Sequence, residues 1–290
     1  MASARSIAAL LALLVAGAAA AVALAVTRPG TGTPQRTVTG AGRARSRPAA
    51  PQHTLPHGAA AIARDLAATT IALRGAIADW RLHGDLGRRG PPLAVARLAA
   101  RQQRQYLRLG ARPALARRVL RRVDPALLAE ARQNISARQA LESIHSVVVQ
   151  RPRIRVGRPA PPVVLRRFYA AASRRFGVRW DVLAAVNFVE SLFGRLRNES
   201  TAGARGPMQF LPATWRAYGM GGDVRDPHDA IMGAANLLHA NGAPGRTRRA
   251  LLAYNPSAGY VEAVLRYARR MRRDPDAFLA YYSWPVPRRR

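Results

Sequence analysis

The stretch from Asp181 to Trp215 constrains this chain more than any other. The apolar residues of its first half recur at helical spacing and predict one stripe on a helix: Val182, Val186, Val189 and Phe193. Asp181 stands where an N-cap or first-turn acid belongs, and Gly194 stands where a helix ends. The pattern therefore predicts a helix that begins at Asp181 and stops near Gly194.

Glu190 lies near the end of this predicted helix, between large apolar residues. Removal from water disfavours the charged form of a carboxyl group, and the negative end of a helix acts in the same direction. We therefore expect the pKa of Glu190 to be raised. A carboxylic acid that keeps its proton near neutral pH is suited to protonating a glycosidic oxygen. The alternative is a surface glutamate at the end of an ordinary helix.

Further short motifs follow Glu190 in order. They are Glu190-Ser191, Phe193-Gly194, Ser200, the segment 202–215 (AGARGPMQFLPATW) and Ala253-Tyr254-Asn255. This series resembles the soluble lytic transglycosylase (SLT) domain, a goose-lysozyme-like family that cuts the glycan strands of peptidoglycan. The resemblance covers residues 164–273.

The resemblance implies a mainly α fold, with a lysozyme-like helical catalytic domain at 164–290 and little or no sheet. It implies Glu190 as the catalytic residue. The residues that it places around the substrate are Ser191, Gly206, Met208, Gln209, Tyr254 and Asn255. In the family the tyrosine hydroxyl sits near the catalytic carboxyl, and the asparagine holds the sugar or the loop. The segment Pro256–Gly259 departs from the Ala-Gly-Pro-Gly of many relatives, so the turn after Asn255 is expected to differ.

The resemblance also implies a route with one carboxylate. Glu190 protonates the oxygen that leaves C1 of N-acetylmuramic acid, then takes the proton of the 6-hydroxyl as a 1,6-anhydro ring closes, without metal or cofactor. Glycosidases with two carboxylates need a second acid across the scissile bond, and Glu199 is a candidate for it. A hydrolytic muramidase on the same scaffold is therefore one alternative. A non-enzymatic protein that binds the cell wall or polyanions is another.

The first 28 residues contain an apolar run behind Arg5, which predicts export by a signal peptide or a retained membrane anchor. Residues 29–56 are rich in Thr, Gly, Pro and Arg and predict a disordered basic linker. The catalytic part is therefore expected outside the cell, on the side of the cell wall. No cysteine is present, so disulfides and thiolate sites are excluded.

Residues 57–150 have the pattern of several helices and predict a helical accessory domain, followed by a Pro/Gly/Arg linker at 151–163. The net charge of +32 favours anionic partners such as wall polymers or an anionic membrane surface, besides the peptidoglycan strands. Nucleic acid is not expected, because no aromatic residues interleave with the arginines of the predicted linker and because export removes the chain from the cytoplasm.

Asp223, Asp226 and Asp229 are spaced like ligands of a cation loop, but the remaining ligands of a calcium hand are missing. Asp226 before Pro227 is more typical of an N-cap, and it predicts a helix from Pro227 to Ala240. We therefore expect a structural role for these aspartates and no metal site.

Overall fold

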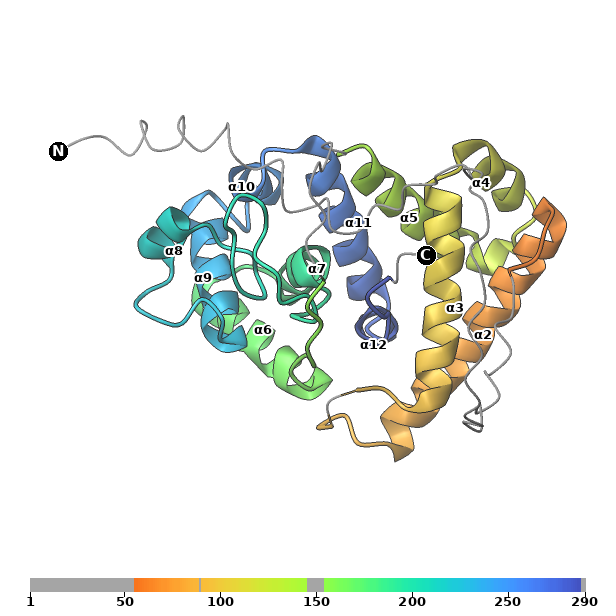
Figure 1. The fold of residues 1–290 in the computed structure, drawn as a ribbon, viewed down its shortest axis with the longest axis horizontal. Helices are drawn as coiled ribbons and strands as arrows, with labels where there is room; N and C mark the ends of the chain where they lie inside the picture. Colours follow the sequence, from red (N-terminus) through yellow and green to blue (C-terminus); the bar gives the residue numbers. More distant parts are fainter. Residues whose placement is uncertain (1–54, 89, 145–153, 288–290) are drawn as a thin grey trace, which may run out of the picture.

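The computed structural model describes residues 55–88, 90–144 and 154–287. These residues form eleven helices and no strand, which confirms the predicted mainly α fold (Figure 1). The helices are α2 (Ala59–His83), α3 (Leu93–Gly110), α4 (Pro113–Leu120), α5 (Pro125–Glu142), α6 (Pro162–Phe176), α7 (Trp180–Ser191), α8 (Pro212–Tyr218), α9 (Pro227–Ala240), α10 (Thr247–Tyr254), α11 (Ala258–Arg273) and α12 (Asp276–Tyr282).

Two helices begin at Asp-Pro pairs, Asp124-Pro125 and Asp226-Pro227. The Asp124 carboxylate accepts a hydrogen bond from the backbone N–H of Ala126 at 2.7 Å, at the start of α5. The Asp226 carboxylate accepts two such bonds, from His228 and Asp229, at the start of α9. Each carboxylate satisfies backbone donors that the first helical turn leaves free, and the following proline has no N–H to satisfy. The predicted capping by Asp226 is confirmed.

Helix α7 lies at the centre of the C-terminal half, where it contacts α6, α9, α11 and α12. Its buried residues are not limited to one stripe, because Asp181 and Asn187 are buried together with the apolar side chains. A helix that is enclosed on most of its circumference belongs to the interior of a domain rather than to its surface. The apolar neighbours Phe188, Leu192 and Phe193 of Glu190 are therefore buried against the core, and Val189 is half-buried.

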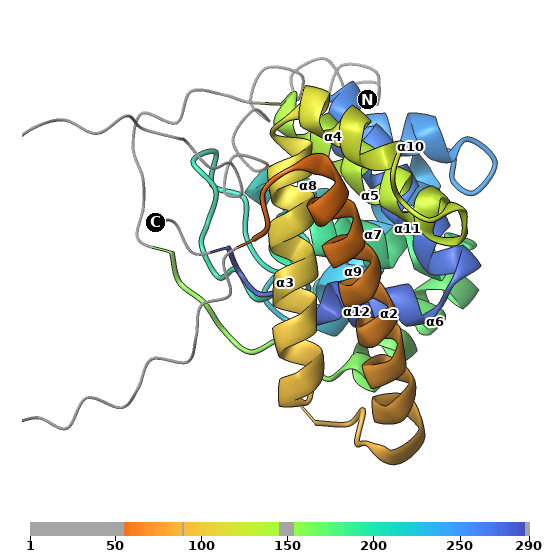
Figure 2. The ribbon, with the colours of Figure 1, turned by 90° about the vertical axis from the view of Figure 1, so that its right-hand side faces the viewer.

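The N-terminal helices pack on the same core. Helix α5 lies along α11, and α2 contacts α12. Figure 2 shows α2 and α3 side by side, with α12 behind them. One continuous hydrophobic core includes residues of α2, α3 and α5 together with residues of α7, α11 and α12. The predicted division into an accessory domain at 57–150 and a catalytic domain at 164–290 stays a prediction.

Part of the predicted linker at 151–163 pairs with the segment that follows α7. The N–H of Gly157 donates to the carbonyl oxygen of Arg195 at 2.8 Å, and the N–H of Arg197 donates to that of Arg155 at 3.0 Å. Val156 and Leu196 form an isolated antiparallel bridge. Residues 154–157 are thus attached to the loop that leaves the end of α7.

The predicted signal or anchor segment (1–28) lies outside the described residues, as does the predicted linker apart from residues 55 and 56. Within the described part of the chain, no helix has both the length and the apolar character needed to cross a membrane.

Candidate active site

Glu190 lies in the last turn of α7, and its exposed fraction is only 8%. Burial penalises the charged carboxylate and raises the pKa of Glu190 to about 8. The neighbouring Tyr260 hydroxyl acts in the opposite direction and lowers this pKa in part. The predicted rise of the pKa is therefore present, and burial is its main cause. At neutral pH most of this carboxyl is in the protonated form that a general acid needs.

Two tyrosines lie beside the Glu190 carboxyl. Burial and the proximity of Glu190 raise the pKa of both Tyr254, the last residue of α10, and Tyr260, in the first turn of α11. Their rings are parallel, with centroids 6.4 Å apart. The Tyr254 hydroxyl donates a hydrogen bond to the carbonyl oxygen of Met208 at 2.6 Å. Tyr254 therefore ties α10 to the segment 202–215 next to Glu190.

The Tyr260 hydroxyl is buried and makes no hydrogen bond of normal geometry within the described part of the chain. It is nevertheless close enough to the Glu190 carboxyl to affect its pKa. Tyr260 is not among the site residues that the sequence predicts. Its position near the start of the helix that follows Tyr254-Asn255 is the signal that could have identified it.

The segment 203–210 forms a tight turn that faces Tyr254. Arg205 and Phe210 exchange backbone hydrogen bonds of 2.8 and 2.9 Å, which close the turn. Gly206 has φ +74°, and a Cβ atom there would lie 1.8 Å from the carbonyl oxygen of Val224. Only glycine is compatible with both the backbone angle and the contact. Gly206 therefore shapes the turn.

Met208 and Gln209 have different environments within this turn. Met208 is fully buried, and its sulfur accepts a hydrogen bond from the side-chain amide of Asn187 in α7 at 3.1 Å. Gln209 is half-buried, and its side-chain amide donates to the carbonyl oxygen of Gly206 at 2.9 Å. The Met208 side chain thus joins the turn to the core, whereas Gln209 retains a surface that a ligand can reach.

The hydroxyl of Ser191 is buried beside the same turn. It donates to the carbonyl oxygen of Pro207 at 2.5 Å and accepts from the N–H of Gly194 at 2.8 Å. These two bonds fasten the end of α7 to the segment that contains Met208. The geometry gives Ser191 a role in holding the site together.

Asn255 is also buried, and its side-chain oxygen accepts a hydrogen bond from the N–H of Ser257 at 3.1 Å. Ser257 in turn caps α11 by accepting from the N–H of Tyr260 at 3.3 Å. In this chain Asn255 therefore shapes the turn that leads from Tyr254 to Tyr260. The two bonds give a physical account of the turn in which the sequence departs from its relatives.

The other acids of the region 164–287 differ from Glu190 in that each has an ion-pair or capping partner. Glu199, the candidate for a second carboxylate, is 46% exposed at its side chain and pairs with Arg205 and Arg225 at 3.2 and 3.1 Å. Four of the remaining acids form ion pairs with arginines: Asp181 with Arg179, Glu262 with Arg248 and Arg266, Asp274 with Arg270, and Asp276 with Arg81. Asp223 and Asp226 accept hydrogen bonds from backbone N–H groups. Asp229 accepts from the N–H of Asp223 and pairs with His228.

Asp226, His228 and Asp229 lie close enough together to be considered as metal ligands, since one ligand atom of each falls within 4.8 Å of the others. Their polar atoms already serve the start of α9. Asp226 accepts from two backbone N–H groups, and Asp229 accepts from the N–H of Asp223. The hydrogen bond from His228 lowers the pKa of Asp229. The cluster is accounted for by helix capping.

Residues 167–276 match the family described as "Transglycosylase SLT domain", which confirms the resemblance for this part of the chain. Similar curated proteins are named membrane-bound lytic murein transglycosylase F. The one from Thiobacillus denitrificans is 31% identical over 122 residues, which are 39% of this chain and 26% of the relative. The one from Pseudomonas fluorescens is 31% identical over 119 residues, which are 38% of this chain and 24% of the relative. The match thus spans about a quarter of these relatives. No solved structure matches the chain.

Proposed function

We propose, from the match of residues 167–276 to the transglycosylase SLT domain, that this chain is a peptidoglycan lytic transglycosylase with Glu190 as its acid and base. The substrate is the β-1,4 bond between N-acetylmuramic acid and N-acetylglucosamine. One observation carries the assignment of the residue. Glu190 is buried in an apolar setting beside two tyrosines, and its pKa is raised to about 8.

The proposed reaction has two proton transfers. Protonated Glu190 donates its proton to the glycosidic oxygen as the bond to C1 of N-acetylmuramic acid breaks. The N-acetyl group of the same sugar stabilises the positive charge that develops at C1. The Glu190 carboxylate then accepts the proton of the 6-hydroxyl, whose oxygen bonds to C1 and forms the 1,6-anhydro ring. Glu190 ends in its starting state, so no net proton is consumed.

The surroundings of Glu190 are suited to both steps. Burial favours the protonated carboxyl before bond cleavage, and it makes the carboxylate a stronger base afterwards. Glu199 is exposed and pairs with two arginines, whereas Glu190 is buried among apolar side chains beside two tyrosines. These observations support the route with one carboxylate over hydrolysis with Glu199.

The test is a digestion of purified peptidoglycan sacculi with analysis of the released sugars by mass spectrometry. The wild type is expected to release muropeptides with 1,6-anhydro ends. Glu190→Gln is expected to bind sacculi and release none, because the amide can neither donate nor accept the proton. Glu199→Gln is the matched control, and its rate is expected to stay within about threefold of the wild type. Reducing ends, together with an inactive Glu199→Gln, would indicate the hydrolase instead.

The arginines around α4 support a second, non-catalytic contact with anionic wall polymers or an anionic membrane surface. These residues are exposed and have no acidic partner in the described part of the chain: Arg112, Arg117, Arg118, Arg121 and Arg122. Binding of the Glu190→Gln variant to sacculi should therefore weaken steeply as the salt concentration rises. Binding that is independent of salt would remove this part of the proposal. The proposed site of action is outside the cell, at the cell wall.

A further inference from the structure

The first turn of α11 brings one of the N-terminal helices, α5, next to the candidate active site. Tyr260, which lies beside the Glu190 carboxyl, follows Gly259, and Gly259 contacts the end of α5. A Cβ atom on Gly259 would lie 2.4 Å from the carbonyl oxygen of Ala140 and 2.9 Å from the Ser143 hydroxyl oxygen. The backbones of the two helices are therefore in direct contact next to Tyr260.

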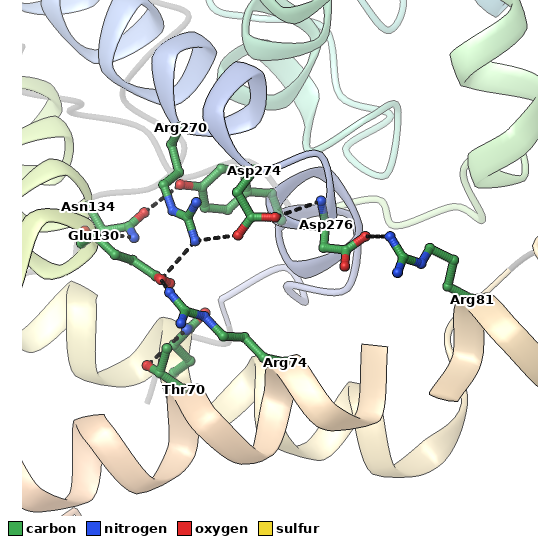
Figure 3. Close-up of polar contacts among 10 residues, drawn as sticks. Thr70, Arg74, Arg81, Glu130, Asn134, Arg270, Asp274 and Asp276 are labelled. Carbon is green, nitrogen blue, oxygen red and sulfur yellow. Dashed lines mark hydrogen bonds and ion pairs between the residues drawn. The ribbon is translucent and has the colours of Figure 1, made fainter. Parts of the chain in front are cut away.

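A second contact holds the other end of α11. The Arg270 guanidinium donates to the Glu130 carboxylate of α5 at 2.7 Å and to Asp274 at the same distance. Figure 3 shows Glu130 between Arg270 and Arg74 of α2. The Arg270 and Glu130 side chains are only 9% and 12% exposed. This buried ion pair fixes the position of α11 along α5, because separating Arg270 from Glu130 would leave an unpaired buried charge.

Helix α5 is also connected to α7, which carries Glu190. The Asn134 side-chain oxygen of α5 accepts a hydrogen bond from the Tyr281 hydroxyl at 2.7 Å. The Tyr281 ring stacks on Phe188 of α7, with ring centroids 5.0 Å apart. Phe188 is buried one half-turn before Glu190. Contacts from α5 thus reach both helices whose side chains meet in the site.

We propose that α5 is a positioning element of the active site, because its last turn sets where α11 begins and so holds Tyr260 against Glu190. On this view the N-terminal helices complete the catalytic domain, in addition to the proposed contact of the α4 arginines with anionic polymers. Two contacts position Tyr260. The backbone of α5 packs against Gly259, and the hydrogen bonds of Asn255 and Ser257 fix the turn before α11. The inference rests on the proposed function, since its effect is on the state of the catalytic carboxyl.

The experiment compares variants of the full chain by their pH–rate profiles on purified sacculi. Tyr260→Phe removes the hydroxyl that lowers the pKa of Glu190, so its alkaline limb is expected to move to higher pH. Gly259→Ala keeps the hydroxyl but forces α5 and α11 apart. We expect its alkaline limb to move in the same direction, with kcat lowered by about tenfold and KM changed by less than about twofold.

Val119→Ala is the matched control, because Val119 is fully buried in α4, a helix that packs on α2, α3 and α5. It is expected to lower the Tm of the protein and to leave the pH profile as in the wild type. A Gly259→Ala variant that likewise loses only stability would overturn the proposal. An inactive wild type would instead refute the proposed function, and the inference with it.

A milder variant decides the question where Gly259→Ala does not fold. Ile144 follows α5, and its Cγ1 lies 3.0 Å from the position of a Cβ on Gly259. Ile144→Ala removes part of this contact without adding atoms. A shift of the alkaline limb to higher pH supports the positioning role of α5, and an unchanged profile refutes it.

Discussion

Replacing Glu190 with glutamine is expected to make the protein more stable, and by an amount that grows with pH. Burial raises the pKa of Glu190 from an ordinary value of 4.5 to about 8, so the folded chain holds this proton more tightly than the unfolded chain. The free energy of unfolding therefore falls as the pH rises above 4.5, because the Glu190 carboxyl ionises more easily in the unfolded chain than in the folded chain. The loss stops increasing once the pH exceeds the folded value. Glutamine is neutral at every pH and avoids this loss.

The size of the effect follows from the two pKa values. The variant should exceed the wild type in unfolding free energy by about 1 kcal/mol at pH 5, about 3 kcal/mol at pH 7 and about 5 kcal/mol at pH 9. Taking the difference between the two proteins cancels the titration of other groups. Urea unfolding followed by circular dichroism at the three pH values measures it.

Glu199→Gln provides the comparison, since this exposed, ion-paired carboxylate should change stability by less than about 1 kcal/mol. A Glu190→Gln difference that stayed below about 1 kcal/mol from pH 5 to pH 9, or that shrank with pH, would contradict a raised pKa of Glu190. It would mean that the carboxyl ionises in the folded protein as easily as in water. Glu190 would then be ionised at neutral pH and could not serve as the proton donor.

Three further predictions concern the site. The rate of glycan release should fall as the pH rises through about 8, because Glu190 must start protonated, and initial rates on sacculi measure this. Gly206→Ala should lower the unfolding free energy by on the order of 2 kcal/mol and abolish release, since a Cβ would collide with the Val224 carbonyl oxygen; a fully active variant would contradict it. Ser191→Ala should cost about 1–2 kcal/mol in urea unfolding while release continues, because its hydroxyl bonds the Pro207 carbonyl; a stable but inactive variant would instead assign it to the substrate.

Much of the helical framework could be predicted from the sequence. The Asp226-Pro227 start predicted α9 from Pro227 to Ala240, as the structure has it. The raised pKa of Glu190 was likewise predictable. Its apolar neighbours are adjacent in the chain, and burial raises the pKa of a carboxyl group. Features such as these depend on residues within one or two turns of each other.

The end of α7 shows where local patterns were insufficient. Gly194 marks the stop, but the helix already turns at Leu192 and Phe193, which have φ values of 52° and 62°. These residues accept an unfavourable backbone conformation because their side chains are buried, and burial depends on segments distant in the sequence. The same limitation applies to Ser191 and Asn255, whose buried bonding partners became known only from the packed chain.

Neighbouring residues in the chain are sufficient to predict that Glu190 is a carboxyl with a raised pKa and that it lies on a helix. The side chains that surround this carboxyl are known only from the packed fold. Tyr260 comes to Glu190 on another helix, and α5 contacts the start of that helix through Gly259. Such contacts join residues far apart in the chain, so no periodicity records them. They follow from the close packing of helices around a shared core.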